Sequence, residues 1–232
     1  MNENDFIHPP SRQDTLMRYE EIFRNTKNWY LSQSNCASES LINFAVMHAG
    51  DTMLDAGCAT GDYIQRLGEL GHHCVGVDIN SEYINKAKQK GLDAHVMDLK
   101  HLEFPDKSFD TILLFEVLEH VAKPEEVIKE ANRVARKNVL ITVPNCTQFH
   151  MLRDVGLTFE HMLEKDHVNF FTKSDLENLL SNCFTKFNVI EAEPIWPYNL
   201  HPWYVRPVLY RLVKLGVIKP SIYYRLYAAA DV

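Results

Sequence analysis

Short apolar runs alternate with segments of helical periodicity through the middle of the chain. The apolar runs end near residues 55, 79, 97, 115 and 143, and those that end near 55, 79 and 115 lead into segments with helical spacing or helix-start signals. Continuous apolar runs of this length are typical of strands that are buried on both faces. Strands that alternate with helices in this way indicate a doubly wound, mostly parallel sheet with helices on both faces. The pattern therefore predicts an α/β fold.

The segments that flank this region divide the chain into three parts. Residues 1–38 are predicted to form a tail and a lid helix at about residues 14–30. Residues 39–194 are predicted to form the sheet-containing domain, which begins with a helix at residues 39–47. Residues 195–232 are rich in Trp, Tyr, Pro and basic residues, and we expect them to form a helical C-terminal extension.

The stretch from Asp55 to Gly61 has the form of a ligand-binding loop. It follows a strand, contains small residues and leads into a helix that starts at Asp62. Gly57 and Gly61 allow positive φ and a close backbone approach to a ligand, and the helix start offers free N–H groups. A dinucleotide loop would place Asp62 beside the pyrophosphate, where its charge would be repulsive. A zwitterionic sulfonium amino acid fits better, because Asp55 can accept from its ammonium group.

The successive motifs resemble those of one enzyme family. They read DAGCATG, VGVDI, MDL, FDTILLFEVLEHV and VLITVPN. Over residues 40–190 this order and spacing is similar to the ubiquinone-biosynthesis-like subgroup of class I S-adenosylmethionine (SAM) methyltransferases. In the family loop motif D-x-G-x-G-x-G, Ala59 replaces the middle glycine, a mild departure if its φ is negative. The resemblance implies a seven-stranded, Rossmann-like sheet whose last hairpin includes an antiparallel strand, with residues 187–192 in one of its strands.

The resemblance also assigns roles to residues near the strand ends. Asp78 lies 23 residues beyond Asp55 (78 − 55), where a carboxylate that binds ribose hydroxyls is expected. The implied SAM-binding residues are Asp55, Gly57, Ala59 and Gly61 for the methionyl part, Asp78 and Ile79 for the ribose, Asp98 and Leu99 for the adenine, and Phe115 beside the cofactor. The segment between Cys146 and His167 is expected to shape the site for the methyl acceptor.

Two histidines are candidates for acid–base chemistry. Methyl transfer from SAM mainly requires alignment of the reactants, but a hydroxyl acceptor must also lose a proton. His120 and His167 are predicted near the carboxyl ends of strands and could take that proton. On a helical turn Glu116, Glu119 and His120 would share one face, and with His167 they resemble the divalent-metal site of small-RNA 2′-O-methyltransferases. The same residue pattern also occurs in metal-free enzymes of this fold, so no metal is predicted.

Composition limits the partners. The 232 residues carry a formal net charge of −7, which argues against nucleic acid as a partner of the whole surface. Five scattered cysteines without a C-x-x-C pair, and a polar N-terminus, favour the cytoplasm. From Ile195 onward five basic residues and one acidic residue give 5 − 1 = +4, and together with the aromatic residues they suggest peripheral membrane contact. A C-terminal helix pair packed on the sheet is the alternative.

The sequence therefore predicts a SAM-dependent methyltransferase that methylates an oxygen of a small-molecule or lipid-linked acceptor. Three alternatives remain open at this point. They are a metal-assisted RNA 2′-O-methyltransferase, a non-catalytic SAM-binding module and a nicotinamide-dependent oxidoreductase.

Overall fold

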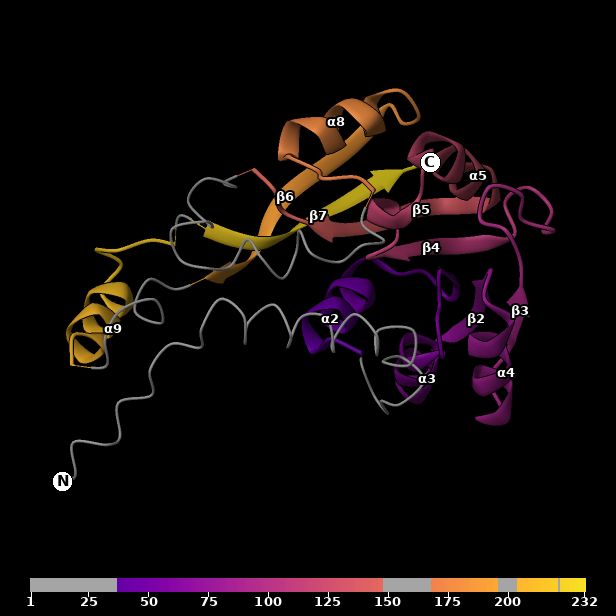
Figure 1. Ribbon diagram of the computed structural model, residues 1–232, viewed down its shortest axis with the longest axis horizontal. Coiled ribbons are helices and arrows are strands. Elements are labelled where there is room, and N and C mark those ends of the chain that lie inside the picture. The colour runs from indigo at the N-terminus through magenta and orange to yellow at the C-terminus, as the bar shows by residue number, and fades with distance from the viewer. Residues whose placement is uncertain (1–36, 148–167, 196–203, 221) are drawn as a thin grey trace, which may run out of the picture. The chain divides into compact units, whose positions relative to one another are not determined.

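The computed structural model describes residues 37–147, 168–195, 204–220 and 222–232, which form one seven-stranded sheet with helices (Figure 1). The strand order is β3-β2-β1-β4-β5-β7-β6. All neighbouring strands from β3 to β5 are parallel, and β7 runs antiparallel to both β5 and β6. The predicted doubly wound, mostly parallel sheet is thus confirmed. The order reverses between β1 and β4, and ligands bind at such a point, outside the carboxyl ends of the strands.

Strands β1 to β6 lie close to the predicted positions, and β7 lies where a helical extension was predicted. Their bounds are β1 Thr52–Ala56, β2 His73–Asp78, β3 Ala94–Val96, β4 Phe109–Phe115, β5 Ala135–Pro144, β6 Lys186–Ile195 and β7 Ile222–Asp231. The helices are α2 Glu39–His48, α3 Asp62–Glu69, α4 Ser81–Gln89, η2 Leu118–His120, α5 Pro124–Val134, α8 Lys173–Ser181 and α9 Arg206–Lys214. Every residue of β4 is buried, as expected for a central strand with helices on both faces.

Two apolar cores lie on opposite faces of the sheet. One core contains Val127 of α5 and Leu176 of α8, and the other contains Leu41 of α2, Ile64 of α3 and Ile84 of α4. Figure 1 shows α5 and α8 above the sheet and α2, α3 and α4 below it. Side chains that alternate along β4 contribute to both cores, so this strand ties the two layers together.

The C-terminal segment differs from the expectation. Residues 222–231 form β7 inside the sheet, and β7 pairs with β5 along seven residues from Asn138↔Asp231 to Pro144↔Arg225. The predicted helical extension is therefore wrong for this part, because the last strand of the domain lies within it. The predicted helix does occur as α9. The lid helix at residues 14–30 lies outside the described residues.

Two further findings bear on the sequence predictions. Among the helices of the described ranges, none is long and apolar enough to cross a membrane. Cys58, Cys74, Cys146 and Cys183 are free thiols.

Candidate active site

The loop after β1 is held by the neighbouring strand. The N–H groups of Gly57 and Cys58 both donate to the carbonyl of Val77, at 2.8 and 3.0 Å. Gly57 and Gly61 have φ values of 99° and 82°, which favour glycine. A Cβ atom at Gly57 would lie 2.5 Å from Cγ2 of Val117, in the segment that follows β4. The Val117 side chain therefore also excludes any residue larger than glycine at this position. The loop is therefore packed closely on both sides.

Ala59 has a positive φ, whereas a negative φ was the condition for a mild replacement of the family glycine. Its φ is +44°, so the condition under which replacement of the family glycine would be mild is not met. The left-handed region costs an L-residue about 1–2 kcal/mol. Its N–H donates to Oδ2 of Asp78 at 3.0 Å, and Oδ1 of Asp78 accepts from Asn80 N–H at 2.8 Å. Asp78, the predicted ribose ligand, thus also holds the strained loop in place.

Ala59→Gly is expected to stabilise the protein by about 0.5–1 kcal/mol, because the relief of positive-φ strain exceeds the entropy cost of glycine. Urea unfolding measures this free energy. Ala122→Gly, at an exposed loop position without positive φ, is the control and should lose stability. A loss of stability in Ala59→Gly equal to that of the control would contradict the strained conformation.

Asp55 is a buried carboxylate with an unused oxygen. Only 2% of the residue is exposed, and its Oδ2 atom has no hydrogen-bond partner among the described residues. Burial, reinforced by the nearby charge of Asp78, raises the pKa of Asp55 to about 7. An unsatisfied buried acceptor costs free energy unless a donor reaches it. The structure therefore fits the predicted role of Asp55 as acceptor for a ligand ammonium group.

Asp62, the first residue of α3, is buried and neutralised. The ammonium group of Lys90 lies 2.6 Å from Asp62 Oδ1 and also donates to the carbonyl of Thr60 at 2.9 Å. This ion pair weakens the argument that Asp62 would repel a pyrophosphate. The preference for SAM over a dinucleotide must therefore rest on other observations.

The predicted cofactor residues lie at one edge of the sheet. Asp55 is next to the last residue of β1, Asp78 ends β2, Asp98 follows β3 by two residues, and Phe115 ends β4. Because β3, β2, β1 and β4 are parallel neighbours, their carboxyl ends meet at the same edge. Ile79 is largely exposed there, whereas Leu99 packs against a core. The sequence prediction that these positions share one site stays a prediction, but their placement is compatible with it.

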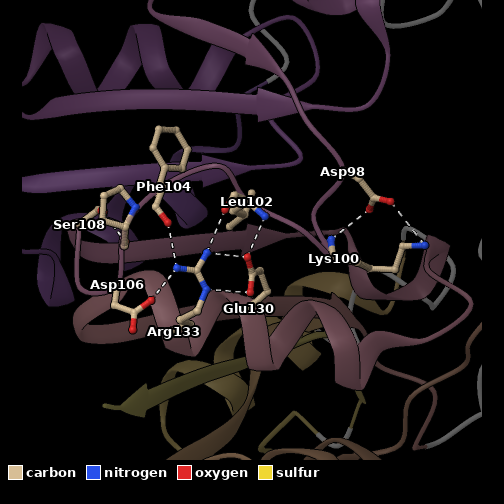
Figure 2. A network of polar contacts seen from close by, with 9 residues as sticks. Asp98, Lys100, Leu102, Phe104, Asp106, Ser108, Glu130 and Arg133 are labelled. Carbon is tan, nitrogen blue, oxygen red and sulfur yellow. Dashed lines mark hydrogen bonds and ion pairs between the residues drawn. The ribbon is translucent and has the colours of Figure 1, made fainter.

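The loop after Asp98 is fixed by a residue that the sequence analysis missed. Arg133 of α5 donates from Nη1 to the carbonyl of Phe104 at 2.8 Å and from Nη2 to that of Leu102 at 2.9 Å (Figure 2). Arg133 also pairs with Asp106 and Glu130, at 2.7 and 2.6 Å. Asp98 itself accepts from the N–H of Lys100. Arg133 thus clamps the segment that carries Asp98 and Leu99.

Arg133→Met should destabilise the protein by about 1–3 kcal/mol, because buried carbonyl acceptors lose their donor. It should also weaken SAM binding several-fold through the loosened loop. Arg66→Met is the matched control, since its side chain is equally exposed (30% against 33%) but pairs only with carboxylates. That variant should change the free energy of unfolding by less than about 1 kcal/mol. If urea unfolding showed the same loss of unfolding free energy in Arg133→Met and Arg66→Met, Arg133 would not act as a clamp on this loop.

The predicted arrangement after β4 is wrong in one respect. Glu116, Glu119 and His120 do not share a helical face, because only Leu118–His120 forms a turn of 3₁₀-helix and Glu116 before it has a φ of +54°. Glu119 is buried, and its Oε1 lies 4.0 Å from Nε2 of His120. Glu116 instead pairs with Arg225. In the described ranges there is no group of three or more His, Cys, Asp or Glu side chains placed to hold a metal ion.

His120 lies beside the segment that follows His167. The N–H groups of Val168 and Asn169 both donate to the carbonyl of Glu119, and the Asn169 side chain donates to the carbonyls of Leu118 and Val121. These bonds fix residue 168 against the turn that carries His120. His167 itself lies outside the described residues.

Aromatic rings and an ionic network surround the end of β4. Tyr63 of α3 and Phe44 of α2 have ring centroids 5.5 and 6.1 Å from that of Phe115. Arg225 and Tyr227 of β7 and Glu193 of β6 join Glu116 in a network that the sequence analysis also missed. The sequence held no signal for it, because its members lie far apart in the chain and only the placement of β7 brings them together.

Comparisons with known proteins find similarity to methyltransferases. Residues 54–143 match the family described as "Methyltransferase domain". A phosphatidylethanolamine N-methyltransferase of Cereibacter sphaeroides is 27% identical over 201 residues, which cover 79% of this chain and 96% of that protein. A ubiquinone biosynthesis O-methyltransferase of Hahella chejuensis is 32% identical over 94 residues. That match covers 38% of this chain and only 40% of that enzyme.

A solved structure confirms the fold. A SAM-dependent methyltransferase from Archaeoglobus fulgidus superposes with a TM-score of 0.66 at 18% sequence identity, covering 94% of this chain and all of that chain. At this identity the likeness concerns the Rossmann-like fold alone.

Proposed function

Because the chain belongs to the class I SAM-dependent methyltransferases, we propose that it methylates an oxygen atom of a small-molecule or lipid-linked acceptor. The match of residues 54–143 to the methyltransferase domain carries methyl transfer, and the relative named a ubiquinone biosynthesis O-methyltransferase supports oxygen as the accepting atom. The relative named a phosphatidylethanolamine N-methyltransferase supports a lipid-linked acceptor, although its name gives nitrogen as the methylated atom.

The residues present fit SAM as the cofactor. The buried Oδ2 of Asp55, which has no hydrogen-bond partner among the described residues, suits an ammonium group. In this proposal Asp55, Gly57, Ala59 and Gly61 hold the methionyl part, Asp78 and Ile79 the ribose, and Asp98 and Leu99 the adenine. Phe115 lies beside the cofactor. Bound SAM supplies a methyl group on a positively charged sulfur, which is a good leaving group.

The chain itself must orient the acceptor and remove its proton. His120 is the candidate base within the described residues, since a third of its side chain is exposed at the carboxyl edge of the sheet. His167 is a second candidate on sequence grounds. We do not extend the proposal to a metal-assisted reaction on RNA, because Glu116 is directed to Arg225 and is thereby separated from Glu119 and His120.

Incubation of a metabolite and lipid extract with labelled SAM tests the proposal without presuming an acceptor. We expect the label to appear in a base-stable ether or a methyl ester of a small or lipid-linked compound. Label only in nucleic acid or only on nitrogen would contradict O-methylation. SAM binding without transfer to any fraction would favour the non-catalytic module.

We also propose that α9 brings the enzyme to an anionic membrane surface. No residue of α9 is buried, and between residues 204 and 220 there are four basic residues and no acidic one. The exposed large apolar side chains of this stretch are Tyr204, Val208, Tyr210, Leu215 and Val217. Arg225, counted with this basic segment in the sequence analysis, belongs to the sheet and is ion-paired, so the proposed surface is limited to α9 and the residues beside it. Trp196 and Trp203 lie outside the described residues.

Charge reversal at Arg211→Glu and Lys214→Glu together should reduce sedimentation with anionic vesicles at least about tenfold, since each basic residue near such a surface contributes about 1 kcal/mol. High salt should reduce binding of the unaltered protein for the same reason. Lys88→Glu with Lys129→Glu makes the same charge change at exposed positions of α4 and α5 and is the control. Equal vesicle binding by both double variants would contradict a role for α9.

A further inference from the structure

An ionic network joins the end of β4 to the last two strands of the chain. Nη1 of Arg225 lies 2.5 Å from Oε2 of Glu193, and its Nε lies 3.1 Å from Oε2 of Glu116. The hydroxyl of Tyr227 donates to Oε1 of Glu193 at 2.6 Å. The side chains of Arg225, Glu193 and Glu116 are 17%, 24% and 25% exposed, so the network is largely buried.

Both carboxylates are held by unusual backbone conformations. Glu116 and Glu193 have φ values of +54° and +56°, in a region that costs an L-residue about 1–2 kcal/mol. In β6 it is Ala192 that pairs with Arg225, so in a regular strand Glu193 would point to the opposite face of the sheet. The positive φ instead lets the Glu193 carboxylate reach Arg225 and Tyr227. The backbone is strained at both positions that supply a partner for Arg225.

Two buried atoms of the network make no hydrogen bond with any residue that the structure describes. They are Oε1 of Glu116 and Nε of Arg225, and Nε forms an ion pair with Oε2 of Glu116. Burial raises the pKa of Tyr227 well above its usual range, and the adjoining Glu193 reinforces this, so the phenol stays neutral. Two carboxylates and one guanidinium therefore give a net charge of 1 − 2 = −1. Such a site suits a hydrogen-bond donor and disfavours an anion.

The network lies at the same edge of the sheet as the cofactor residues. Arg225 pairs with Pro144, the last residue of β5, and Glu116 directly follows Phe115, the last residue of β4. The ring of Tyr63 packs on that of Phe115, with centroids 5.5 Å apart. Burial raises the pKa of its phenol to about 12, and the hydrogen bond from the N–H of Ser38 opposes the rise.

We propose that Glu116 binds the hydroxyl group of the methyl acceptor through Oε1 and that Arg225 is the positioning residue that directs Glu116 to it. The inference rests on the proposed O-methylation and narrows it, because the acceptor is then an alcohol or a phenol. A carboxylate acceptor would bring a second negative charge to an oxygen that can only accept. Phe115 directly precedes Glu116, and the ring of Tyr63 packs on that of Phe115, which favours an acceptor with an apolar or aromatic body.

A binding experiment tests the hydroxyl site without turnover. The protein saturated with S-adenosylhomocysteine is titrated with benzyl alcohol and with benzoate, which share a ring and carbon skeleton, and binding is followed by saturation-transfer NMR. We expect benzyl alcohol to bind at least tenfold more tightly than benzoate. In Glu116→Gln the preference should fall below threefold or invert, because the amide can donate to a carboxylate.

Matched variants separate recognition from structure. Glu191 lies in β6, as Glu193 does, and its carboxylate accepts a hydrogen bond from the Asn145 side chain. Glu191→Gln should keep the preference of the unaltered protein for benzyl alcohol. Arg225→Met should lose the preference with S-adenosylhomocysteine affinity unchanged, and Arg225→Lys should restore part of it. Circular dichroism confirms that each variant is folded.

Three results would overturn the inference. They are no binding of benzyl alcohol, equal binding of the two probes, and a preference that Glu116→Gln leaves unchanged. Transfer of labelled methyl groups from SAM is measured separately. Failure of transfer together with the expected probe preference would refute the proposed function and leave the hydroxyl site at Glu116 standing.

Discussion

Replacement of Asp55 by Asn should weaken SAM binding by about 10- to 100-fold and remove most of its pH dependence below pH 7.5. A hydrogen bond to a charged group contributes about 1.5–3 kcal/mol, and the buried Oδ2 of Asp55 has no other partner among the described residues. With a pKa of about 7, the carboxyl of the free protein is mostly protonated at pH 5.5 and mostly ionised at pH 7.5. The affinity of the unaltered protein for SAM should therefore rise between these pH values, and calorimetry measures it.

The same substitution should stabilise the protein in the absence of SAM. Below about pH 4 the carboxyl is protonated in both the folded and the unfolded chain, so it contributes no difference. Between about pH 4 and 7 the unfolded chain loses the proton and the folded protein keeps it, so the free energy of unfolding falls as pH rises. Above pH 7 the carboxyl is ionised in the folded protein as well, and the full free-energy cost of its buried charge is present. Asp55→Asn should then be more stable than the unaltered protein by on the order of 2–4 kcal/mol.

Asp51→Asn is the control for both measurements, because Asp51 is exposed at the opposite end of β1. It should leave the SAM affinity and its pH profile unchanged. A SAM affinity that does not vary from pH 5.5 to 7.5 in the unaltered protein, or full affinity in Asp55→Asn, would contradict the role of Asp55.

The second large effect is expected at His120. If this histidine takes the proton of an oxygen acceptor, His120→Ala should lower kcat by about 10²- to 10⁴-fold while the SAM affinity stays nearly unchanged. Its backbone N–H donates to the carbonyl of Val117, and this bond is kept in the variant. The assay is methyl transfer from labelled SAM to the acceptor that the extract experiment identifies.

His72→Ala is the matched control, since His72 lies in the turn before β2 at the opposite edge of the sheet. Its turnover should equal that of the unaltered protein. Full activity of His120→Ala would remove His120 as the base and leave His167 as the remaining candidate.

Strands β1 to β5 could be predicted because local sequence patterns mark where each one lies in the chain. Strands buried on both faces require continuous apolar runs, and the runs of β1 and β2 are each followed by a short turn and a helix. Helix starts are also set locally, since the side chains of Thr172 and Asp175 form a capping box at the start of α8. Asp55, Asp78 and Phe115 could be placed near one edge for the same reason, because each ends a run.

The parts that could not be predicted depend on contacts between distant residues. β7 contains Tyr227 and a run of three alanines, a composition that also suits a helix, and its state is decided by pairing with β5 and β6. The direction of Glu116 follows from its positive φ and from Arg225, neither of which has a local signal. Lys90 likewise has no local signal that marks it as the partner of Asp62. Because this ion pair neutralises Asp62, repulsion between Asp62 and a pyrophosphate is weaker than the sequence suggests.

The central claim is that the carboxyl edge of β1, β2, β3 and β4 binds SAM. Calorimetric titration of the full chain with SAM, S-adenosylhomocysteine and NAD tests it most directly. The account predicts saturable binding of SAM and of its demethylated product at one site and no heat of binding for NAD. Binding of NAD with no binding of SAM would contradict it.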